Sequence, residues 1–357
     1  MVTLQALFGL VVFIGIAVLF SEQRRMLNWQ LLAAGLGLQF LVAFVMFRFE
    51  LLQALLNALN QVVVAIADAT ETGSLFLFGY LGGDPSNVAY PFSIDNPEAT
   101  VILAFRILPL ILIFTVLSAI LWHFRILPLI VRGFSVVLRR AMGVSGAVGL
   151  SAAANIFIGM VESPALIRPY IKGLTRSELF VVMSCGMATI AGTVMVLYSV
   201  ILGEVIDNAL GHILTASVIS APAAIMLALI MVPATPKDSG KITGGDAVDI
   251  STDYHNVMDA IVRGTSDGLK LMVNVGAMLL VFIALVALFN SALLLVPYSS
   301  SDPFTLQTIL GWMFAPLVWL MGIPWQEAQL AGTLMGIKTA LNELLAFLAL
   351  VDLPAAS

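Results

Sequence analysis

The chain has 357 residues, of which 60% are hydrophobic and 10% are charged, and its formal net charge at pH 7 is -5. Soluble domains carry about 25% charged residues, so this composition excludes an ordinary soluble protein and predicts a polytopic membrane protein. The single Cys185 excludes a disulfide framework, the three histidines are too scattered for a metal cluster, and no basic stripe indicates nucleic acid as a partner.

Windows of about 20 apolar residues predict the membrane spans. The windows cover 3–20, 29–47, 101–122, 179–202, 212–232, 271–295 and 333–350. No small-residue cleavage site precedes Ser21, so we interpret the first window as a retained span. Residues 50–72 carry apolar side chains at helical spacing opposite Gln, Asn and Asp, which favours an amphipathic helix along the membrane interface.

Basic residues assign the sides of the membrane. Arg24 and Arg25 follow the first span, which predicts a cytoplasmic loop and a periplasmic N-terminus. The loop 68–98 contains acidic residues and neither Lys nor Arg, so it is predicted outside. Basic residues flank both ends of the apolar stretch 141–167. A single span would place one of these basic clusters outside, so the pattern favours a re-entrant hairpin that enters the membrane and returns to the cytoplasm.

The stretch "ANIFIGMVESP" (154–164) lies at the predicted tip of this hairpin. Gly159 permits the turn, and Pro164 can open the following helix. Asn155 and Glu162 lie on opposite sides of the turn, and an ionisable residue in a membrane is a candidate functional residue. The structural alternatives are that Glu162 pairs with a buried basic residue and that Asn155 only ties helices together.

The second half repeats this arrangement. The stretch 308–326 is predicted to form a hairpin that opens outward, and the span after it carries "KTALNELLAF" (338–347). Asn342 and Glu343 form its polar pair, with Lys338 one helical turn away, where it could simply pair with a glutamate on its own helix. Inverted repeats with broken helices and polar groups at mid-membrane depth are typical of secondary transporters.

These features predict four parts of the chain. They are N-terminal scaffold spans with the interfacial helix (1–135), a first hairpin and core repeat (136–235), a cytoplasmic loop with an interfacial helix (236–270), and a scaffold span with a second hairpin and an incomplete core repeat (271–357).

Several long segments resemble, in the same order, the bacterial concentrative nucleoside transporter family. They include "NIFIGMVESPALIRPYI", "TRSELFVVMSCGMATIAGTVMVLYSVILG", "GWMFAPLVWLMGIPWQEAQLAGTLMG" and "KTALNELLAFLAL", and the resemblance covers essentially the whole chain. It implies an all-α polytopic membrane protein, an inverted-repeat transporter with two re-entrant hairpins and broken helices. It further implies a homotrimeric symporter of the bacterial inner membrane, in contact with lipid, that imports nucleosides on a sodium or proton gradient without another cofactor.

The resemblance also implies a sodium site. Its ligands would be the side chains of Asn155 and Thr189 and the carbonyl groups of Ile158 and Ile190. Such a set is chemically coherent, because a hard cation prefers oxygen ligands.

For the nucleoside, the resemblance implies two carboxylates and two apolar walls. Glu162 would meet the base and Glu343 the ribose hydroxyls, while Val194 and Leu271 would supply the walls. A carboxylate that accepts two vicinal hydroxyls can favour ribose over deoxyribose, since a missing hydroxyl leaves a buried acceptor unpaired.

The hairpin tip departs from the family pattern. The family usually has Gly-Gln-Thr/Ser-Glu, whereas this chain has Gly159, Met160, Val161 and Glu162. Two side chains that would hydrogen-bond the base are therefore apolar, which predicts either relaxed base selectivity or a preference for another nucleobase or a related solute. Met160 is suited to packing on a ring, or it forms only a wall.

The C-terminus is a second departure. Family members continue with one more span that contacts the ribose, whereas this chain ends at "VDLPAAS", so we expect that it does not transport alone. One alternative is a non-transporting remnant that acts as a membrane scaffold. A membrane hydrolase is disfavoured, because the chain has no GxSxG, no HExxH and no histidine near either glutamate, so we predict that it is not an enzyme.

The heptapeptide "FRILPLI" occurs at 105–111 and again at 124–130. It is too short and too closely spaced to be a solenoid repeat, and the family resemblance accounts for the first copy only.

Overall fold

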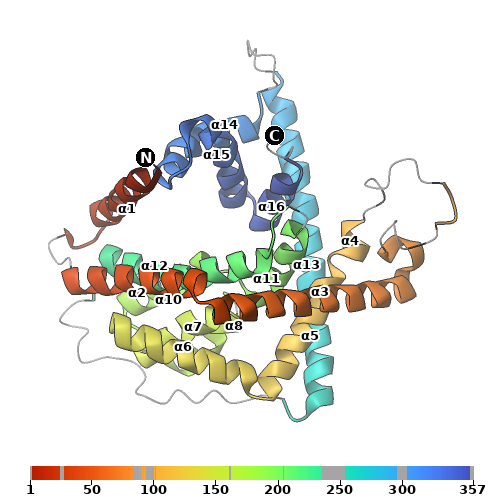
Figure 1. Ribbon diagram of the computed structural model, residues 1–357, viewed down its shortest axis with the longest axis horizontal. Coiled ribbons are helices and arrows are strands. Elements are labelled where there is room, and N and C mark those ends of the chain that lie inside the picture. Colours follow the sequence, from red (N-terminus) through yellow and green to blue (C-terminus); the bar gives the residue numbers. More distant parts are fainter. Residues whose placement is uncertain are drawn as a thin grey trace. The chain divides into compact units, whose positions relative to one another are not determined.

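The computed structural model describes residues 2–24, 28–83, 88, 90–93, 100, 102–160, 162–203, 205–234, 254–295 and 304–353. The regular elements within these ranges are helices, which confirms the predicted all-α class (Figure 1). Six helical segments of the described chain are long and apolar enough to cross a membrane, and α1 (Val2–Leu19) is a shorter apolar helix.

The chain divides into two compact units. Unit 1 comprises Met1–Ala17, Glu204–Ile206 and Val273–Ser357, and unit 2 comprises Val18–Gly203 and Asp207–Met272. Unit 1 contains most of α1, the second part of α13 (Val257–Leu293), and the helices α14 (Leu306–Leu320), α15 (Trp325–Ala340) and α16 (Glu343–Val351). Unit 2 contains α2 (Trp29–Arg48), α3 (Glu50–Phe78), η2 (Gly79–Gly82), α4 (Leu103–Arg106), α5 (Pro109–His123), α6 (Ile126–Met142), α7 (Gly146–Asn155), α8 (Glu162–Leu166), α9 (Arg168–Ile171), α10 (Arg176–Ala188), α11 (Gly192–Leu202) and α12 (Ala209–Met231).

Helix α12 organises unit 2. It packs against α2, α3, α6, α10 and α11, and most of the side chains on its apolar surface are buried. Hydroxyl groups satisfy carbonyls at its C-terminal end: Ser21 Oγ donates to the carbonyl of Ile230 at 2.6 Å, and Ser177 Oγ donates to that of Val232 at 2.6 Å. These bonds compensate for carbonyls that lack a partner within the helix.

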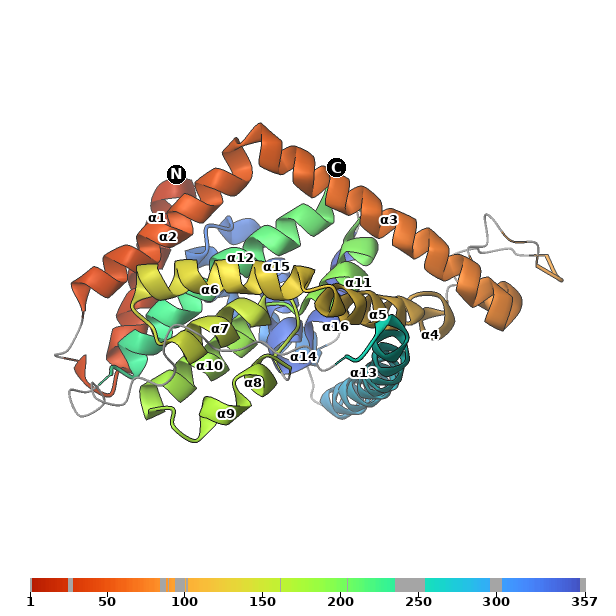
Figure 2. The same ribbon diagram turned by 90° about the horizontal axis from the view of Figure 1, so that it is seen from below.

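The predicted interfacial helix 50–72 is α3, which follows α2 after a bend at Phe49 (Figure 2). It extends to Phe78 and, with η2, is itself long and apolar enough to span a membrane. Length and composition therefore do not separate an interfacial position of α3 from a spanning one.

The basic residues that precede the apolar stretch 141–167 lie on helix α6. It buries one face against α7, beside which it lies in Figure 2. Arg132 and Arg140 are exposed on the rest of its surface.

Both copies of the repeated heptapeptide lie at helix junctions, one at each end of α5. In the first copy α4 ends at Arg106 and α5 begins at Pro109; in the second, α5 ends at His123 and α6 begins at Ile126. Each copy thus lies where one helix gives way to the next and places a proline in the first turn of the next helix, a position where its missing N–H is not needed.

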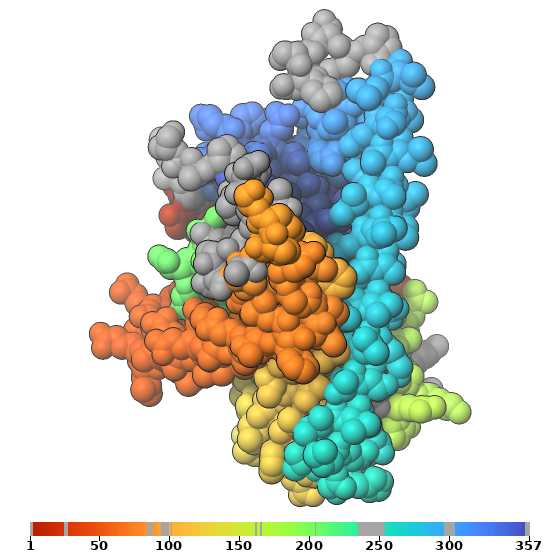
Figure 3. Space-filling model, turned by 90° about the vertical axis from the view of Figure 1, so that its right-hand side faces the viewer, coloured from red at the N-terminus to blue at the C-terminus, as the bar shows by residue number. Residues whose placement is uncertain are grey.

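Helix α13 is drawn in teal to light blue in Figure 3. It exposes large apolar side chains along its length, among them Val262, Leu269, Leu280 and Leu288. Extended apolar surface of this kind is unusual for a soluble monomer and suits a helix that faces lipid or another subunit.

The first hairpin is formed by α7 and α8. Ser163 Oγ lies 2.8 Å from Ser151 Oγ and donates to the carbonyl of Ser151 at 2.6 Å, so the two short helices are held side by side by buried groups. Gly159 lies at the turn with φ 103°, a conformation that L side chains rarely adopt. The predicted turn residue is therefore confirmed, and Pro164 lies in the first turn of α8.

The second hairpin is formed by α14 and α15, whose axes are bent by 117° at a short break. Gly322 occupies this break with φ 105°, nearly the value found for Gly159. Both turns thus place a glycine at nearly the same positive φ. Only Gly159 was predicted from the sequence as a turn residue.

The predicted span 333–350 is interrupted by a break between two helices. Helix α15 ends at Ala340 and α16 begins at Glu343, and Leu341 and Asn342 between them have non-helical dihedral angles. The Asn342 side chain accepts a hydrogen bond from the backbone N–H of Leu345 at 2.9 Å. An asparagine that caps a new helix competes with continuation of the old one, so the apolar window contains a break.

We predict that Gly322→Ala lowers the thermal unfolding temperature of the purified protein in detergent. A Cβ at φ 105° is strained and costs about 1–3 kcal/mol. Gly37→Ala is the matched control, because a Cβ at Gly37 in α2 meets nothing within 4 Å. Equal unfolding temperatures for the two variants would contradict the assignment of the turn.

Candidate functional site

A break in unit 2 separates α10 from α11 and is held from two sides. Thr189 and Ala191 have extended backbone angles, so the helix stops at Ala188 and restarts at Gly192. The backbone N–H of Ile190 donates to Ser217 Oγ of α12 at 3.2 Å, and that of Gly192 donates to the carbonyl of Phe157 at 3.1 Å. The break is therefore joined directly to the tip of the first hairpin.

Asn155 is the last residue of α7 and lies two residues before Phe157. The residue is 2% exposed, and among the described residues its Oδ1 has no hydrogen-bond partner. A Cβ at Gly186 would lie 3.3 Å from Asn155 Nδ2, so α10 passes close to the amide. A buried amide oxygen without a partner is costly, and this cost is removed if the oxygen binds a cation or a donor.

The other predicted sodium ligands lie on the same two segments. Thr189 and Ile190 belong to the break, and Ile158 follows Phe157 at the hairpin tip. Thr189 Oγ1 donates to the carbonyl of Cys185 at 2.9 Å, which leaves its lone pairs available to accept. The bond from the N–H of Gly192 to the carbonyl of Phe157 thus places the break that contains Thr189 and Ile190 next to the hairpin tip that contains Ile158. Amide, hydroxyl and carbonyl oxygens are ligand types that fit a hard cation.

Ser217 is a member of this junction that the sequence did not indicate. It is 2% exposed, and its Oγ lies 3.2 Å from the nitrogen and 3.5 Å from the oxygen of Ile190. The only available signal was a hydroxyl residue inside an apolar span, and such residues commonly bond only to their own helix.

The predicted nucleoside residues are distributed over both units. In unit 2, Met160 is 58% exposed at the hairpin tip and its Cβ lies close to Gly186, while Val194 is half-buried in the first turn of α11. Leu271 lies on α13, one turn after Gly268, which packs against Leu112 of α5. Glu162 begins α8, Val161 lies outside the described residues, and Glu343 belongs to unit 1.

In unit 1, Glu343 is paired with Lys338. Lys338 Nζ lies 3.4 Å from Glu343 Oε1, with the lysine in the last turn of α15 and the glutamate at the first position of α16. One interpretation of the sequence was that Lys338 pairs with a glutamate on its own helix. Lys338 and Glu343 instead lie on two helices, on either side of the break at which Asn342 caps α16.

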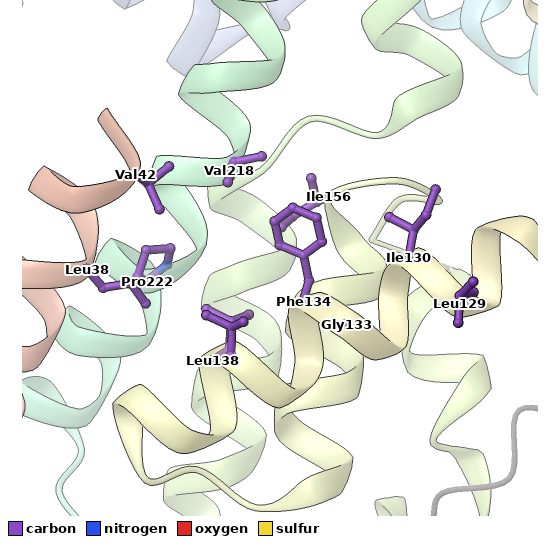
Figure 4. Close-up of a pocket in the computed structure, with 11 residues that line it drawn as sticks. Leu38, Val42, Leu129, Ile130, Gly133, Phe134, Leu138, Ile156, Val218 and Pro222 are labelled. Carbon is purple, nitrogen blue, oxygen red and sulfur yellow. The ribbon is translucent and has the colours of Figure 1, made fainter. Parts of the chain in front are cut away.

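An apolar cavity of about 410 Å³ lies behind the hairpin tip, between α2, α6 and α12 (Figure 4). Phe134 points toward Ile156 in this view, and its ring centroid is 5.5 Å from that of Phe157. The lining side chains are apolar, so this cavity offers no hydrogen bonds to a base or a sugar. It therefore forms the apolar backing of the junction and is a poor candidate for the solute site.

Two hairpins, two helix breaks and a buried unpaired amide define a secondary transporter of the broken-helix class. Three family models match the chain: "Na+ dependent nucleoside transporter N-terminus" at residues 8–81, "Nucleoside recognition" at 104–205, and "Na+ dependent nucleoside transporter C-terminus" at 212–357. The chain belongs to this family, the concentrative nucleoside transporters, as its sequence predicted.

Relatives and solved structures agree with this assignment. The chain is 32% identical over 351 residues to the nucleoside permease NupC of Helicobacter pylori, which covers 98% of this chain and 80% of that protein. It is 30% identical over 342 residues to sodium/nucleoside cotransporter 1 of Rattus norvegicus, covering 95% of this chain and 49% of that protein. A structure of CNTnw in an inward-facing substrate-bound state is 34% identical, with a TM-score of 0.87 over 100% of this chain and 82% of that one.

We predict that Gly192→Ala destabilises the junction between the break and the hairpin tip. A Cβ at Gly192 would lie 2.4 Å from the carbonyl oxygen of Phe157, so the backbone must move, at a cost of about 1–3 kcal/mol. Gly73→Ala in α3, where nothing lies within 4 Å, is the control. Thermal unfolding and protease resistance near the hairpin report the effect, and an unchanged Gly192→Ala protein would refute the contact.

Proposed function

We propose that the chain is a secondary active symporter that imports nucleosides on a sodium gradient. Membership of the family supports the substrate class, and the buried, unpaired Oδ1 of Asn155 beside a helix break supports a coupling cation. Coupling to protons is the variant reading. Neither the expectation that the chain does not transport alone nor a non-transporting remnant is favoured, because the matches to transporters run through the whole chain.

The proposed ion ligands are Asn155 Oδ1, Thr189 Oγ1 and the carbonyl oxygens of Ile158 and Ile190. A sodium ion at this position satisfies the amide oxygen that otherwise lacks a partner, and it holds the hairpin tip to the break. Met160 and Glu162 follow the tip directly in the chain. Ordering the tip therefore orders residues proposed to meet the solute, which gives ion and solute binding a shared free energy.

The proposed solute contacts are Glu162 on the base side and Glu343 at the ribose hydroxyls, with apolar walls from Val194 and Leu271. Met160 and Val161 occupy the tip positions next to the base. Because neither side chain can hydrogen-bond a base edge, selectivity among bases depends on Glu162 and on ring packing with Met160. A nucleobase-like solute without ribose is the alternative substrate.

We further propose a homotrimer in the bacterial inner membrane, surrounded by lipid, with the N-terminus on the periplasmic side. The exposed apolar surface of α13 supports burial against lipid or other subunits. The orientation rests on Arg24 and Arg25 after the first span. We include in this proposal the division of the chain into the four parts 1–135, 136–235, 236–270 and 271–357.

Asn155→Ala should abolish the stabilisation of the protein by sodium. A ligand that binds only the native state stabilises it by about 2.7 kcal/mol at 100 times its dissociation constant. The wild type should therefore unfold at a higher temperature in sodium chloride than in equimolar choline chloride, and the variant should not. Asn155→Asp, which keeps an oxygen ligand, and Asn60→Ala on α3 are the controls; an Asn155→Ala protein with the full sodium shift would refute the site.

Glu343→Gln should weaken binding of uridine and remove its preference over 2′-deoxyuridine. Hydrogen bonds to a charged acceptor contribute about 1.5–3 kcal/mol, so roughly a 10- to 150-fold loss in affinity is expected. Calorimetry in sodium buffer measures both ligands, with Glu327→Gln at the start of α15 as the control. Uracil that binds the wild type as tightly as uridine would instead indicate a nucleobase-like solute.

A further inference from the structure

The ion pair between Lys338 and Glu343 bridges the break of unit 1. Lys338 lies in the last turn of α15, where unpaired carbonyls favour a cation, and Glu343 is the first residue of α16, where unpaired N–H groups favour an anion. Their charged atoms are 3.4 Å apart, and the side chains are only partly exposed. Each charge thus lies at the helix end that stabilises it, opposite its partner.

Lys338 has no substitute in unit 1. The sequence of Met1–Ala17, Glu204–Ile206 and Val273–Ser357 contains no other Lys or Arg. Helix α14, which packs against α15, carries no ionisable side chain. Glu327 lies in the first turn of α15, about 16 Å along the helix axis from Lys338, and Asp352 follows the far end of α16.

The charge of Glu343 poses a different problem with and without solute. A nucleoside carries no net charge, but its ribose hydroxyls can donate to the carboxylate and replace water there. Once the solute has left, a lone carboxylate in apolar surroundings is expensive, particularly while the carrier changes from one side of the membrane to the other.

We propose that Lys338 is a positioning residue that neutralises Glu343 in the solute-free carrier and so permits its return across the membrane. This inference rests on the proposed function and on the assignment of Glu343 to the ribose. The ammonium group holds the carboxylate until ribose hydroxyls arrive, and it takes the carboxylate back when they leave. Lys338 therefore contributes most to the step in which the carrier moves empty.

Two transport modes separate this role from a purely structural one. Net uptake into vesicles without nucleoside requires the empty carrier to return in every cycle. Exchange of external for internal nucleoside needs only the loaded carrier, in which the ribose hydroxyls already satisfy Glu343. Loss of Lys338 should therefore slow net uptake and spare exchange.

The experiment uses Lys338→Met in the full chain, reconstituted into liposomes, with radiolabelled uridine and an inward sodium gradient. We expect net uptake to fall roughly tenfold, equivalent to about 1.4 kcal/mol on the barrier of the return step, while exchange stays near the wild-type rate. Lys338→Arg keeps the cation and should retain both modes.

Lys270→Met is the matched control, because Lys270 forms an exposed pair of the same length, 3.4 Å, with Asp267 on α13. It should leave both modes unchanged. Net uptake and exchange that fall together in Lys338→Met, or that both stay at wild-type rates, would overturn the inference alone. A wild type without uridine flux in either mode would overturn the proposed function and the inference with it. Thermal unfolding of each variant identifies a folding defect, in which case Lys338→Gln replaces Lys338→Met in the same comparison.

Discussion

The structure depends on one constraint: where an apolar helix is interrupted, its backbone and side-chain polar groups must be satisfied inside the protein. Three of the interruptions described above meet it with specific partners. The break after α10 uses Ser217 Oγ and the carbonyl of Phe157, the break before α16 uses the side chain of Asn342, and Ser151 with Ser163 closes the first hairpin. Water cannot hydrogen-bond these groups in the hydrocarbon core of a membrane, so polar side chains are needed where the helices are interrupted.

The two halves solve this constraint with similar backbones and different charges. Gly159 and Gly322 turn the hairpins at φ 103° and 105°. Before the first turn, the buried Oδ1 of Asn155 has no hydrogen-bond partner among the described residues, and in the second half an ion pair, Lys338 with Glu343, spans the break. The first arrangement can accept a cation from outside, whereas the second already contains one.

Much of the fold could be predicted, because composition and charge act over long windows. The spans follow from apolar length, and the first hairpin follows from the basic residues on both of its flanks. The break at Leu341 and Asn342 was not predicted, because its neighbours keep the window apolar while the single side chain of Asn342 caps a new helix. Helix α6 escaped because its arginines were interpreted only as a topology signal. Among the site residues, Asn155 was identifiable as a polar residue in an apolar stretch. Ser217 was not, because a bond from one helix to the backbone of another leaves no pattern in sequence.

The repeated "FRILPLI" has a consequence at the level of the gene product. Since each copy lies where one helix gives way to the next, deletion of the segment from one copy to the other would remove α5 and leave a junction of unchanged local sequence between α4 and α6. The helix end and helix start at this junction would form as they do in the intact chain. The deletion would nevertheless remove most of Leu103–His123, a segment long and apolar enough to cross a membrane, and the loss of one crossing reverses the side of every later loop. Such a deletion would leave the local secondary structure at the new junction unchanged and would alter the membrane topology of the rest of the chain.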